Sequence, residues 1–281
     1  MRRLRITHTT GFNYDGEVSA SYNEARMLPL DTRKQLLLHS TLDITPVSSR
    51  DAYVDYWGTR VTTFESLRPH DSLNLSARSL VELQSREHVP GDVSWDALDG
   101  IGDRSKMLSD QLFATEHTSP PAELAALAKE VADRSDTPAE AARTICDTIG
   151  DRLEYVPGST NVTDTASVVW DKQKGVCQDI AHVTLGALRS IGIPARYVSG
   201  YLQPSKDPEI GEEMSAQSHA WIEWYCGTWT GYDPTNSLEI ADSHVIVGYG
   251  RDYHDVAPLR GLYAGSARAT LFVNVAITRE A

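Results

Sequence analysis

The hydrophobic pattern of this 281-residue chain changes its period twice. Residues 1 to about 90 contain short alternating or β-rich runs separated by turn residues, and the clearest run spans residues 73–83. From residue 121 to about residue 191 the apolar positions recur with the period of a helix that has one apolar face. After Pro194 the period returns to two. The pattern predicts an α+β protein that begins with a β-sandwich or a partly closed barrel.

The punctuation between these regions predicts two domains. Residues 90–120 are mixed and contain Pro90-Gly91 and Ser119-Pro120-Pro121, so we interpret this stretch as the domain connection. We expect an N-terminal β-domain over residues 1–115 and a second domain over residues 116–281, which are ordinary domain sizes. Within the first, Asn13-Tyr14-Asp15-Gly16 and Trp57-Gly58 are typical of hairpin turns.

Two helices have clear boundaries. Thr137-Pro138-Ala139-Glu140 has the order of an N-cap, a first-turn proline and a capping-box acid, so a helix should run from there to about Arg152. Cys146 falls in the middle of it beside apolar positions, which predicts an inert, buried thiol. The second helix should begin at about Cys177 and end at Gly192-Ile193-Pro194.

The overall charge limits the range of partners. The formal net charge is −13 and the isoelectric point is about 5.1, which argues against binding to nucleic acid or to an anionic membrane surface. No run approaches the roughly 20 apolar residues that span a bilayer, and the basic start of the chain lacks the apolar region of a signal peptide. Three cysteines do not form a disulfide framework, so we expect a reducing cytoplasm.

Three short segments each carry one residue type that thiol catalysis needs, namely Gly175-Val176-Cys177-Gln178-Asp179, Ser218-His219-Ala220-Trp221 and Tyr232-Asp233-Pro234-Thr235. Cys177 sits where the apolar helical stripe begins. The unpaired N–H groups and partial positive charge of a first helical turn favour a thiolate over a thiol, and they can also face an oxyanion. A buried inert cysteine is the alternative that position alone leaves open.

His219 and Asp233 lie on two strand-like segments that could form one hairpin. A symmetric three-residue loop at Tyr225-Cys226-Gly227 would place the two residues directly opposite each other and on one face, whereas a two-residue loop would shift the register by one. A carboxylate in that position would fix the imidazole tautomer and stabilise its protonated form. A lone strand histidine or an Asp-Pro-Thr turn is more often structural, and only the combination with Cys177 favours catalysis.

These segments resemble the transglutaminase-like core that transglutaminases share with related bacterial cysteine proteases. The order Cys, His, Asp matches, as do the motifs Gly-Val-Cys-Gln-Asp, His-Ala-Trp and Asp-Pro-Thr, and residues 188–201 are similar to the helix and strand that follow the cysteine. Residues 7–14 and 23–26 resemble the β-domain that precedes this core in bacterial members. The resemblance implies a papain-like core of helices packed on an antiparallel sheet. It also implies that Cys177, His219 and Asp233 form a catalytic triad.

The resemblance further implies an oxyanion site made by the backbone N–H of the cysteine and one upstream group. Tyr155 and Trp170 are candidates, and Tyr155 is preferred because it begins a Tyr-Val-Pro-Gly-Ser-Thr loop like that of the bacterial family. Gln178, directly after the nucleophile, could instead line the site. Packing is the alternative role for all three residues.

No cofactor is implied. Asp179 and His182 have a spacing that metal ligands can adopt, but no further ligand cluster accompanies them, so we expect no metal there. The chain has no EF-hand pattern, and the resemblance therefore implies no calcium.

The residues predict acyl transfer from a peptide or isopeptide amide through a cysteine thioester. Water as the acceptor would give a peptidase or amidase, which we favour, and an amine acceptor would give a transglutaminase. A non-catalytic protein-binding module is the third interpretation, and an arylamine acyltransferase, which also uses Cys, His and Asp, is a fourth. The expected partner is a peptide or protein substrate. The sequence gives no indication of the oligomeric state.

Overall fold

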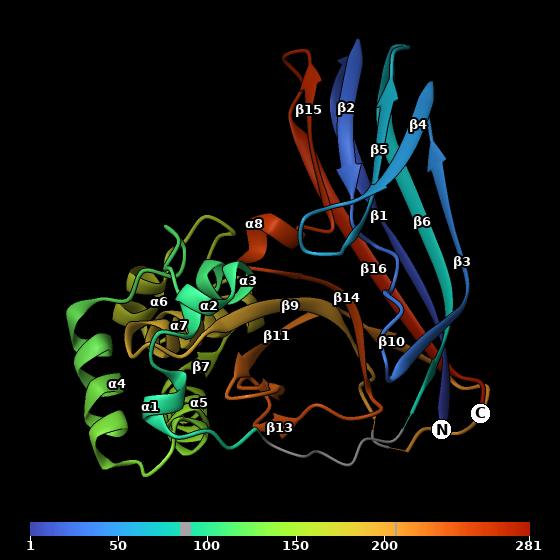
Figure 1. The fold of residues 1–281 in the computed structure, drawn as a ribbon. Helices are drawn as coiled ribbons and strands as arrows, with labels where there is room; N and C mark the ends of the chain where they lie inside the picture. Colours follow the sequence, from blue (N-terminus) through green and yellow to red (C-terminus); the bar gives the residue numbers. More distant parts are fainter. Residues whose placement is uncertain (85–90, 206) are drawn as a thin grey trace.

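The computed structural model describes residues 1–84, 91–205 and 207–281. Figure 1 shows two halves, an upright stack of long strands and a helix-rich half beside its lower part. The predicted α+β class is confirmed, with a strand region followed by helices packed on an antiparallel sheet. None of the described helices combines the length and the apolarity needed to cross a bilayer.

The first six strands form most of a two-sheet sandwich. One sheet has the order β10-β16-β1-β6-β3 and the other has the order β15-β2-β5-β4. Apolar residues from both sheets fill the space between them, with Phe64 facing Leu73 and Leu75. The bounds are β1 Arg2–Val18, β2 Ala20–Ala25, β3 Gln35–Thr45, β4 Ser49–Val54, β5 Arg60–Ser66 and β6 His70–Leu83.

One of the two predicted hairpin turns is present. Gly58 has a φ of 84°, which suits glycine, and lies in the turn that joins β4 to β5. The prediction of a turn at residues 13–16 is wrong, because these residues continue β1. The pairing of β1 with β6 shifts register between Asn13 and Val18, so the turn-like residues mark an irregularity inside a long strand.

The end of the chain returns to the first domain. Strand β16 (Ala269–Arg279) pairs with β1, β15 (Leu259–Ala264) pairs with β2, and β10 (Glu213–Ala216) pairs with β16. The expected division into residues 1–115 and 116–281 therefore needs correction, because the C-terminal strands complete both sheets of the sandwich. In addition, Leu98 and Ile101 lie within the expected N-terminal domain, but their side chains pack in the core of the helical half.

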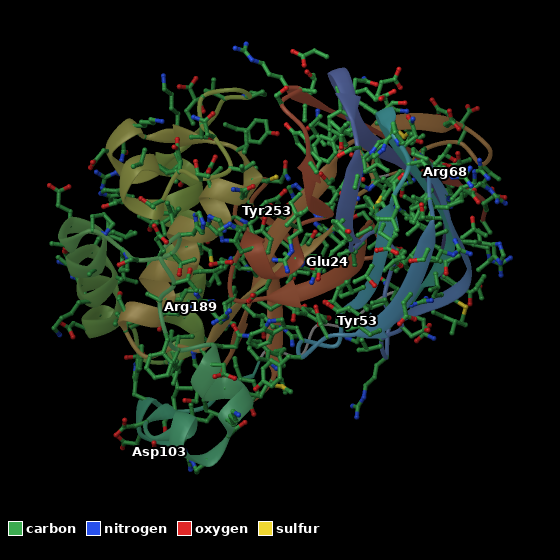
Figure 2. The ribbon with its side chains drawn as sticks, turned by 90° about the horizontal axis from the view of Figure 1, so that it is seen from above. Glu24, Tyr53, Arg68, Asp103, Arg189 and Tyr253 are labelled. Carbon is green, nitrogen blue, oxygen red and sulfur yellow. The ribbon has the colours of Figure 1, made fainter. Side chains whose placement is uncertain are left out.

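The helical half is built around α7 (Cys177–Ser190), which is buried from Gln178 to Arg189. Thr137 caps α5 as predicted, accepting a hydrogen bond from the Glu140 N–H at 3.2 Å. Figure 2 shows Arg189 within this half and Tyr253 at its junction with the strands. The other helices are α1 Trp95–Leu98, α2 Ile101–Arg104, α3 Lys106–Asp110, α4 Ala122–Arg134, α5 Pro138–Arg152, α6 Ala166–Lys172 and α8 Tyr253–Val256.

A five-stranded antiparallel sheet, in the order β13-β12-β11-β9-β14, supports α7. Ala220, Ile222 and Trp224 from β11 pack in the same core as the apolar face of α7. The strands are β9 Ala195–Leu202, β11 Ser218–Tyr225, β12 Trp229–Asp233, β13 Leu238–Glu239 and β14 His244–Gly250, and a parallel pair joins β7 Glu154–Tyr155 to β8 Lys174–Gly175.

The β11–β12 hairpin has a different register from the predicted one. Tyr225 pairs with Trp229, so the loop is Cys226-Gly227-Thr228 and lies one residue later than expected. Gly227 has a φ of 96°, which explains why the turn centres on it. The shift moves the pairing by two residues, so Asp233 lies level with Trp221 and not with His219. A two-residue shift preserves the strand face, and His219 and Asp233 still share one.

Candidate active site

Cys177 is the first residue of α7, and a small network fixes the turn around it. The Asp179 carboxylate accepts hydrogen bonds from the Val176 N–H at 2.8 Å and from the Thr160 hydroxyl at 2.6 Å. A Cβ atom on Gly175 would lie 2.7 Å from the Asp179 Cβ, so glycine at 175 leaves room for this carboxylate to reach back. The result is half of a capping box that holds the helix start in place.

This cap fixes the orientation of the Cys177 N–H but does not accept a hydrogen bond from it. In the described part of the chain, this N–H has no hydrogen-bond acceptor, whereas the N–H groups of Asp179 and Ile180 donate to the Val176 carbonyl at 2.9 and 3.0 Å. A free N–H at the positive end of a helix can stabilise an anion that develops next to the sulfur.

His219 lies at the start of β11 and is tied to Asp233. Its Nε2 lies 2.6 Å from the Asp233 Oδ2, and the carboxylate is fully buried. The side chain of Asn236 donates to the same Oδ2 at 2.8 Å, and the backbone N–H of Thr235 donates to Oδ1 at 3.0 Å. His244 Nε2 lies 3.6 Å from Oδ2. These contacts hold the carboxylate in one orientation.

The charges of this pair support each other. Burial lowers the pKa of His219, but hydrogen bonds to Asp233 and Cys177 outweigh it and raise the pKa to about 10. Burial raises the pKa of Asp233, and its hydrogen bonds from His219, His244 and Asn236 bring it well below the usual range of a carboxyl group. An imidazolium beside a carboxylate is therefore the stable state at neutral pH.

The three cysteines differ in their surroundings. Cys177 is partly exposed and within hydrogen-bonding reach of His219. Because Nε2 of the imidazole bonds Asp233, Nδ1 is the nitrogen left for the thiol. Cys146 is fully buried in the helical core, as predicted, and burial raises its pKa. Cys226 is also buried, and burial raises its pKa to about 12. Only Cys177 combines access with a base.

A cavity of about 310 Å³ contains Cys177 and His219 and lies between the two halves of the molecule. The helical half and its sheet provide one wall, which includes Cys177, His219 and Tyr155. Strands of the sandwich provide the other, through His8 and Thr10 of β1 and Leu271 and Val273 of β16. The returning C-terminal strand therefore provides part of the second wall of the cleft.

Comparison with known proteins accounts for both halves. The model of the transglutaminase-like superfamily matches residues 125–234, and that of the bacterial transglutaminase-like N-terminal region matches residues 4–82. An uncharacterised protein of Mycobacterium leprae is 39% identical over 281 residues and covers 100% of both chains. The chain belongs to the transglutaminase-like superfamily. An uncharacterised protein of Mycobacterium tuberculosis is 31% identical over 297 residues, which is 97% of this chain and 91% of the relative.

The fold of this transglutaminase-like protein is also found in a solved structure. The crystal structure of a "putative cysteine protease" from Cytophaga hutchinsonii has a TM-score of 0.77 with 22% identity, and the match covers 99% of this chain and 97% of that one. The arrangement of sandwich and core is thus shared along the full chain.

Among the oxyanion candidates of the transglutaminase-like protein, Tyr155 lies at the cavity. It belongs to β7, which pairs with β8 two residues before Cys177, and the nearby Cys177 contributes, after burial, to raising the pKa of its hydroxyl. Gln178 also lines the cavity, but its amide donates to the Val162 carbonyl at 3.3 Å.

Trp170 is not at the cavity and is removed from the candidates. Its ring is buried in the helical core, with the Arg152 guanidinium 4.1 Å from the ring centroid. Its position in α6, one turn before the chain reaches β8, turns it toward the packed side of that helix. The packing role is the one that the structure supports.

The described residues contain no group of three or more His, Cys, Asp or Glu side chains placed to hold a metal. Asp179 and His182, whose spacing had suggested ligands, have other partners. Asp179 caps α7, and His182 accepts a hydrogen bond from the Tyr253 N–H at 3.1 Å.

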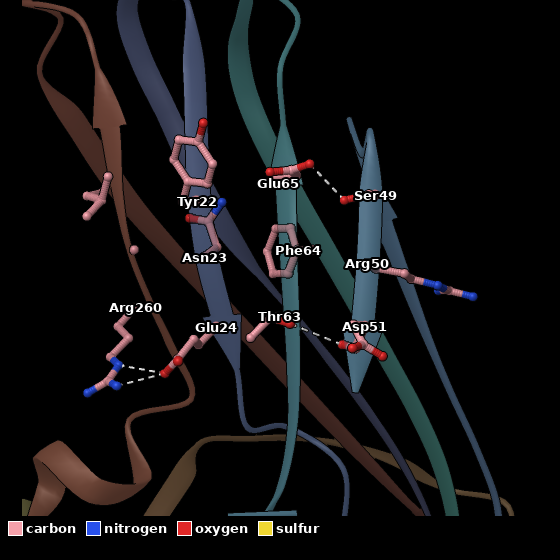
Figure 3. A pocket seen from close by; sticks show the side chains of 12 residues that line it. Tyr22, Asn23, Glu24, Ser49, Arg50, Asp51, Thr63, Phe64, Glu65 and Arg260 are labelled. Atoms are coloured by element: carbon pink, nitrogen blue, oxygen red, sulfur yellow. Dashed lines mark hydrogen bonds and ion pairs between the residues drawn. The ribbon is translucent and has the colours of Figure 1, made fainter. Parts of the chain in front are cut away.

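A larger cavity, about 670 Å³, lies elsewhere, on the outer face of the β15-β2-β5-β4 sheet (Figure 3). Its wall contains Tyr22 and several carboxylates, and Arg260 pairs with Glu24 at 2.7 Å. No cysteine or histidine is among its described lining residues, so it lacks a nucleophile with a base. Chemistry, and not size, places the candidate site at Cys177.

Several residues that contact Asp233 or line the cavity were not predicted. Asn236 follows Asp233 by three residues, and its spacing in the Asp-Pro-Thr-Asn turn was the only signal available. His244 reaches the site from the opposite edge of the sheet, and His8 from the other half of the molecule. Such long-range neighbours depend on strand order, which local patterns do not encode.

Proposed function

We propose that Cys177, His219 and Asp233 form a catalytic triad for acyl transfer from peptide or isopeptide amides. The observation that carries the proposal is the position of His219, which contacts the buried Asp233 on one side and the helix-start Cys177 on the other. This order of nucleophile, base and orienting acid is what thiol acyl transfer requires.

In the first step the Cys177 sulfur attacks the amide carbonyl carbon. The carbonyl oxygen becomes an oxyanion, which the Cys177 N–H faces, with the Tyr155 hydroxyl as the proposed second donor. The C–N bond then breaks, His219 gives its proton to the departing nitrogen, and a thioester remains on Cys177. Asp233 keeps the imidazole in the required tautomer and stabilises its charged form.

In the second step an acceptor attacks the thioester. With water, His219 takes one proton, the C–S bond breaks, and a carboxylic acid leaves while the thiolate of Cys177 and the imidazolium of His219 are restored. With an amine, the product is a new amide. We favour water, because Cys177 is partly exposed in this cavity and solvent can therefore reach a thioester formed on it. We place this activity in the cytoplasm, on peptide or protein substrates.

Two assays on the same glutamine-containing peptides distinguish the acceptors. Hydrolysis predicts cleaved or deamidated peptide with no incorporation of a labelled primary amine, and His219→Ala should abolish it. His39→Ala, which removes an exposed histidine, is the matched control. Amine incorporation without cleavage would favour the transglutaminase alternative.

A non-catalytic binding module is the second candidate. It would bind peptides equally well in the wild type and in Cys177→Ala, with no product in either assay. Turnover that depends on Cys177 excludes it.

A further inference from the structure

The outer edge of strand β16 is only partly covered. β16 pairs with β1 along residues 269–279, and its other edge pairs with β10 only along residues 275–278. Among the described residues, no strand pairs with residues 269–274 on that side. An open edge of this kind presents unpaired N–H and C=O groups to any extended chain that reaches it.

The hydrogen-bond phase of β16 shows which residues face this open edge. The Glu280 N–H donates to the Arg3 carbonyl at 2.8 Å, and the Asp15 N–H donates to the Arg268 carbonyl at 3.1 Å. In both contacts the residue on the β16 side, Arg268 or Glu280, has an even number, so the even-numbered residues of β16 direct their backbone groups toward β1. Because the ladder alternates, Leu271 and Val273 direct their N–H and C=O groups away from β1. The Arg279 carbonyl follows the same phase and accepts from Gly211 on the far side, at 2.8 Å.

The side chains of the same two residues line the triad cavity. Leu271 and Val273 are 53% and 50% exposed, and both contribute to the cavity that contains Cys177 and His219. Further along the same strand face, Val275 and Ile277 are buried against Tyr201 of β9 and Val245 of β14, in the sheet that supports α7. The apolar face of β16 thus emerges from the domain interface at the point where the cleft opens.

The path of β10 connects this edge with the catalytic residues. β10 leaves β16 after Ala216, which pairs with Val275. Three residues later the chain places His219 in the site. A peptide laid beside Leu271 and Val273 would occupy the position in the sheet that β10 has left, and it would extend into the cavity at Cys177.

We propose that the substrate of this site is an extended polypeptide segment that binds as an added strand on the edge of β16 at residues 271–273. This inference rests on the proposed function and names its substrate class. Main-chain hydrogen bonds to Leu271 and Val273 hold the segment, and every second side chain of the segment packs against the exposed side chains of these two residues. Recognition is then insensitive to most of the sequence but sensitive to backbone N–H groups and to length.

Peptide chloromethyl ketones of one to five alanines test the proposal on the full-length protein. The Cys177 thiolate displaces chloride from the methylene carbon, so that one C–S bond forms as one C–Cl bond breaks, and His219 keeps the proton that it already holds. The second-order rate constant should rise about tenfold or more once the peptide is long enough to form two edge hydrogen bonds. Iodoacetamide, which has no peptide, reports the reactivity of Cys177 by itself.

N-methylation of single peptide nitrogens supplies the matched control within the probe. In an added strand only every second residue directs its N–H toward the edge of β16. Methyl groups on these nitrogens should remove the increase in rate constant, and methyl groups on the intervening nitrogens should not. In the protein, Val273→Pro removes one outward N–H without taking a donor from the β1 ladder, and it should abolish the length dependence. Val273→Thr keeps the N–H and should retain it.

The outcomes separate the two proposals. No length dependence in the wild type, or no alternation on N-methylation, overturns strand addition even if Cys177 reacts well with iodoacetamide. An unreactive Cys177 in the wild type instead contradicts the proposed function. If Val273→Pro fails to fold, the N-methylated probes on the wild-type protein still decide.

Discussion

Asp233 shows how much of the site depends on one buried charge. Its carboxylate contacts His219, Asn236 and the backbone of Thr235, and it has no exposed surface. Such a group is costly to bury alone and is stable here because each lone pair has a donor. The histidine in turn keeps its proton because of this carboxylate.

Asp233→Asn should therefore weaken the imidazolium. Without the carboxylate, burial is opposed only by Cys177, and the pKa of His219 should fall from about 10. We expect acyl transfer to drop by roughly a hundredfold or more, because the base is no longer held and charged. Steady-state rates of the two proteins measure this. Asp133→Asn, in an exposed pair with Lys129 on α4, is the control and should have no effect.

Two buried histidines predict a dependence of stability on pH. Burial lowers the pKa of His8 to about 4 and, as the largest effect, that of His182 to about 3. Near pH 6.5 and below, the unfolded chain binds protons that the folded chain does not, so the free energy of unfolding falls as the pH is lowered toward 4. For His8 the loss is up to about 3 kcal/mol.

His219 has the opposite sign, since its raised pKa adds stability below its unfolded value and loses it as the pH rises toward 10. Urea unfolding at pH 7 and pH 5 measures the net slope. His8→Phe should make the difference between the two pH values smaller. An unchanged difference would show that His8 does not remain neutral in the fold.

At the scale of elements, the start of α7 carries the nucleophile and is held by one side chain. Asp179→Ala removes the acceptor for the Val176 N–H and for the Thr160 hydroxyl. We expect a loss of about 1–2 kcal/mol in the free energy of unfolding, with slower alkylation of Cys177 because the helix start frays. Chemical denaturation and alkylation rates measure the two effects. If the free energy of unfolding is unchanged but Cys177 is alkylated more slowly, the cap positions Cys177 without contributing to stability.

The elements also show what the sequence can and cannot predict. The capped helix at Thr137, the helix start at Cys177 and the strands around His219 and Asp233 are local patterns, and all are present. The hairpin register was wrong by two residues, because Gly227 takes the positive φ of the turn and moves the loop. A shift of two residues leaves His219 and Asp233 on the same face of the sheet, which is why the two side chains are still in contact.

At the scale of the whole molecule, the chain closes on itself. β1 lies between β16 and β6, so the first and last strands are neighbours in one sheet (Figure 1). The return to a period of two after Pro194 predicted strands in this part of the chain but not their partners, because pairing across more than 250 residues leaves no local signal. For the same reason the contribution of the sandwich to the cleft could not be predicted.

Removal of residues 259–281 should consequently unfold the protein and not simply shorten it. The deletion exposes the partners of Val275 and Ile277, both buried, and leaves β1 and β2 with open edges. We expect loss of the cooperative thermal transition and aggregation. Circular dichroism and size-exclusion chromatography check this. A truncated chain that folds and keeps a reactive Cys177 would show that the helical half folds without β15 and β16.

The central claim is that Cys177 and His219 form a reactive thiol–imidazole pair. It is tested most directly by iodoacetamide alkylation, with mass spectrometry resolving Cys177 from Cys146 and Cys226, in the wild type and in His219→Ala. Our account predicts fast, selective labelling of Cys177 at neutral pH, lost in the variant, while the two buried cysteines stay unlabelled in both. Equal labelling of Cys177 in the two proteins, or none in the wild type, would contradict it.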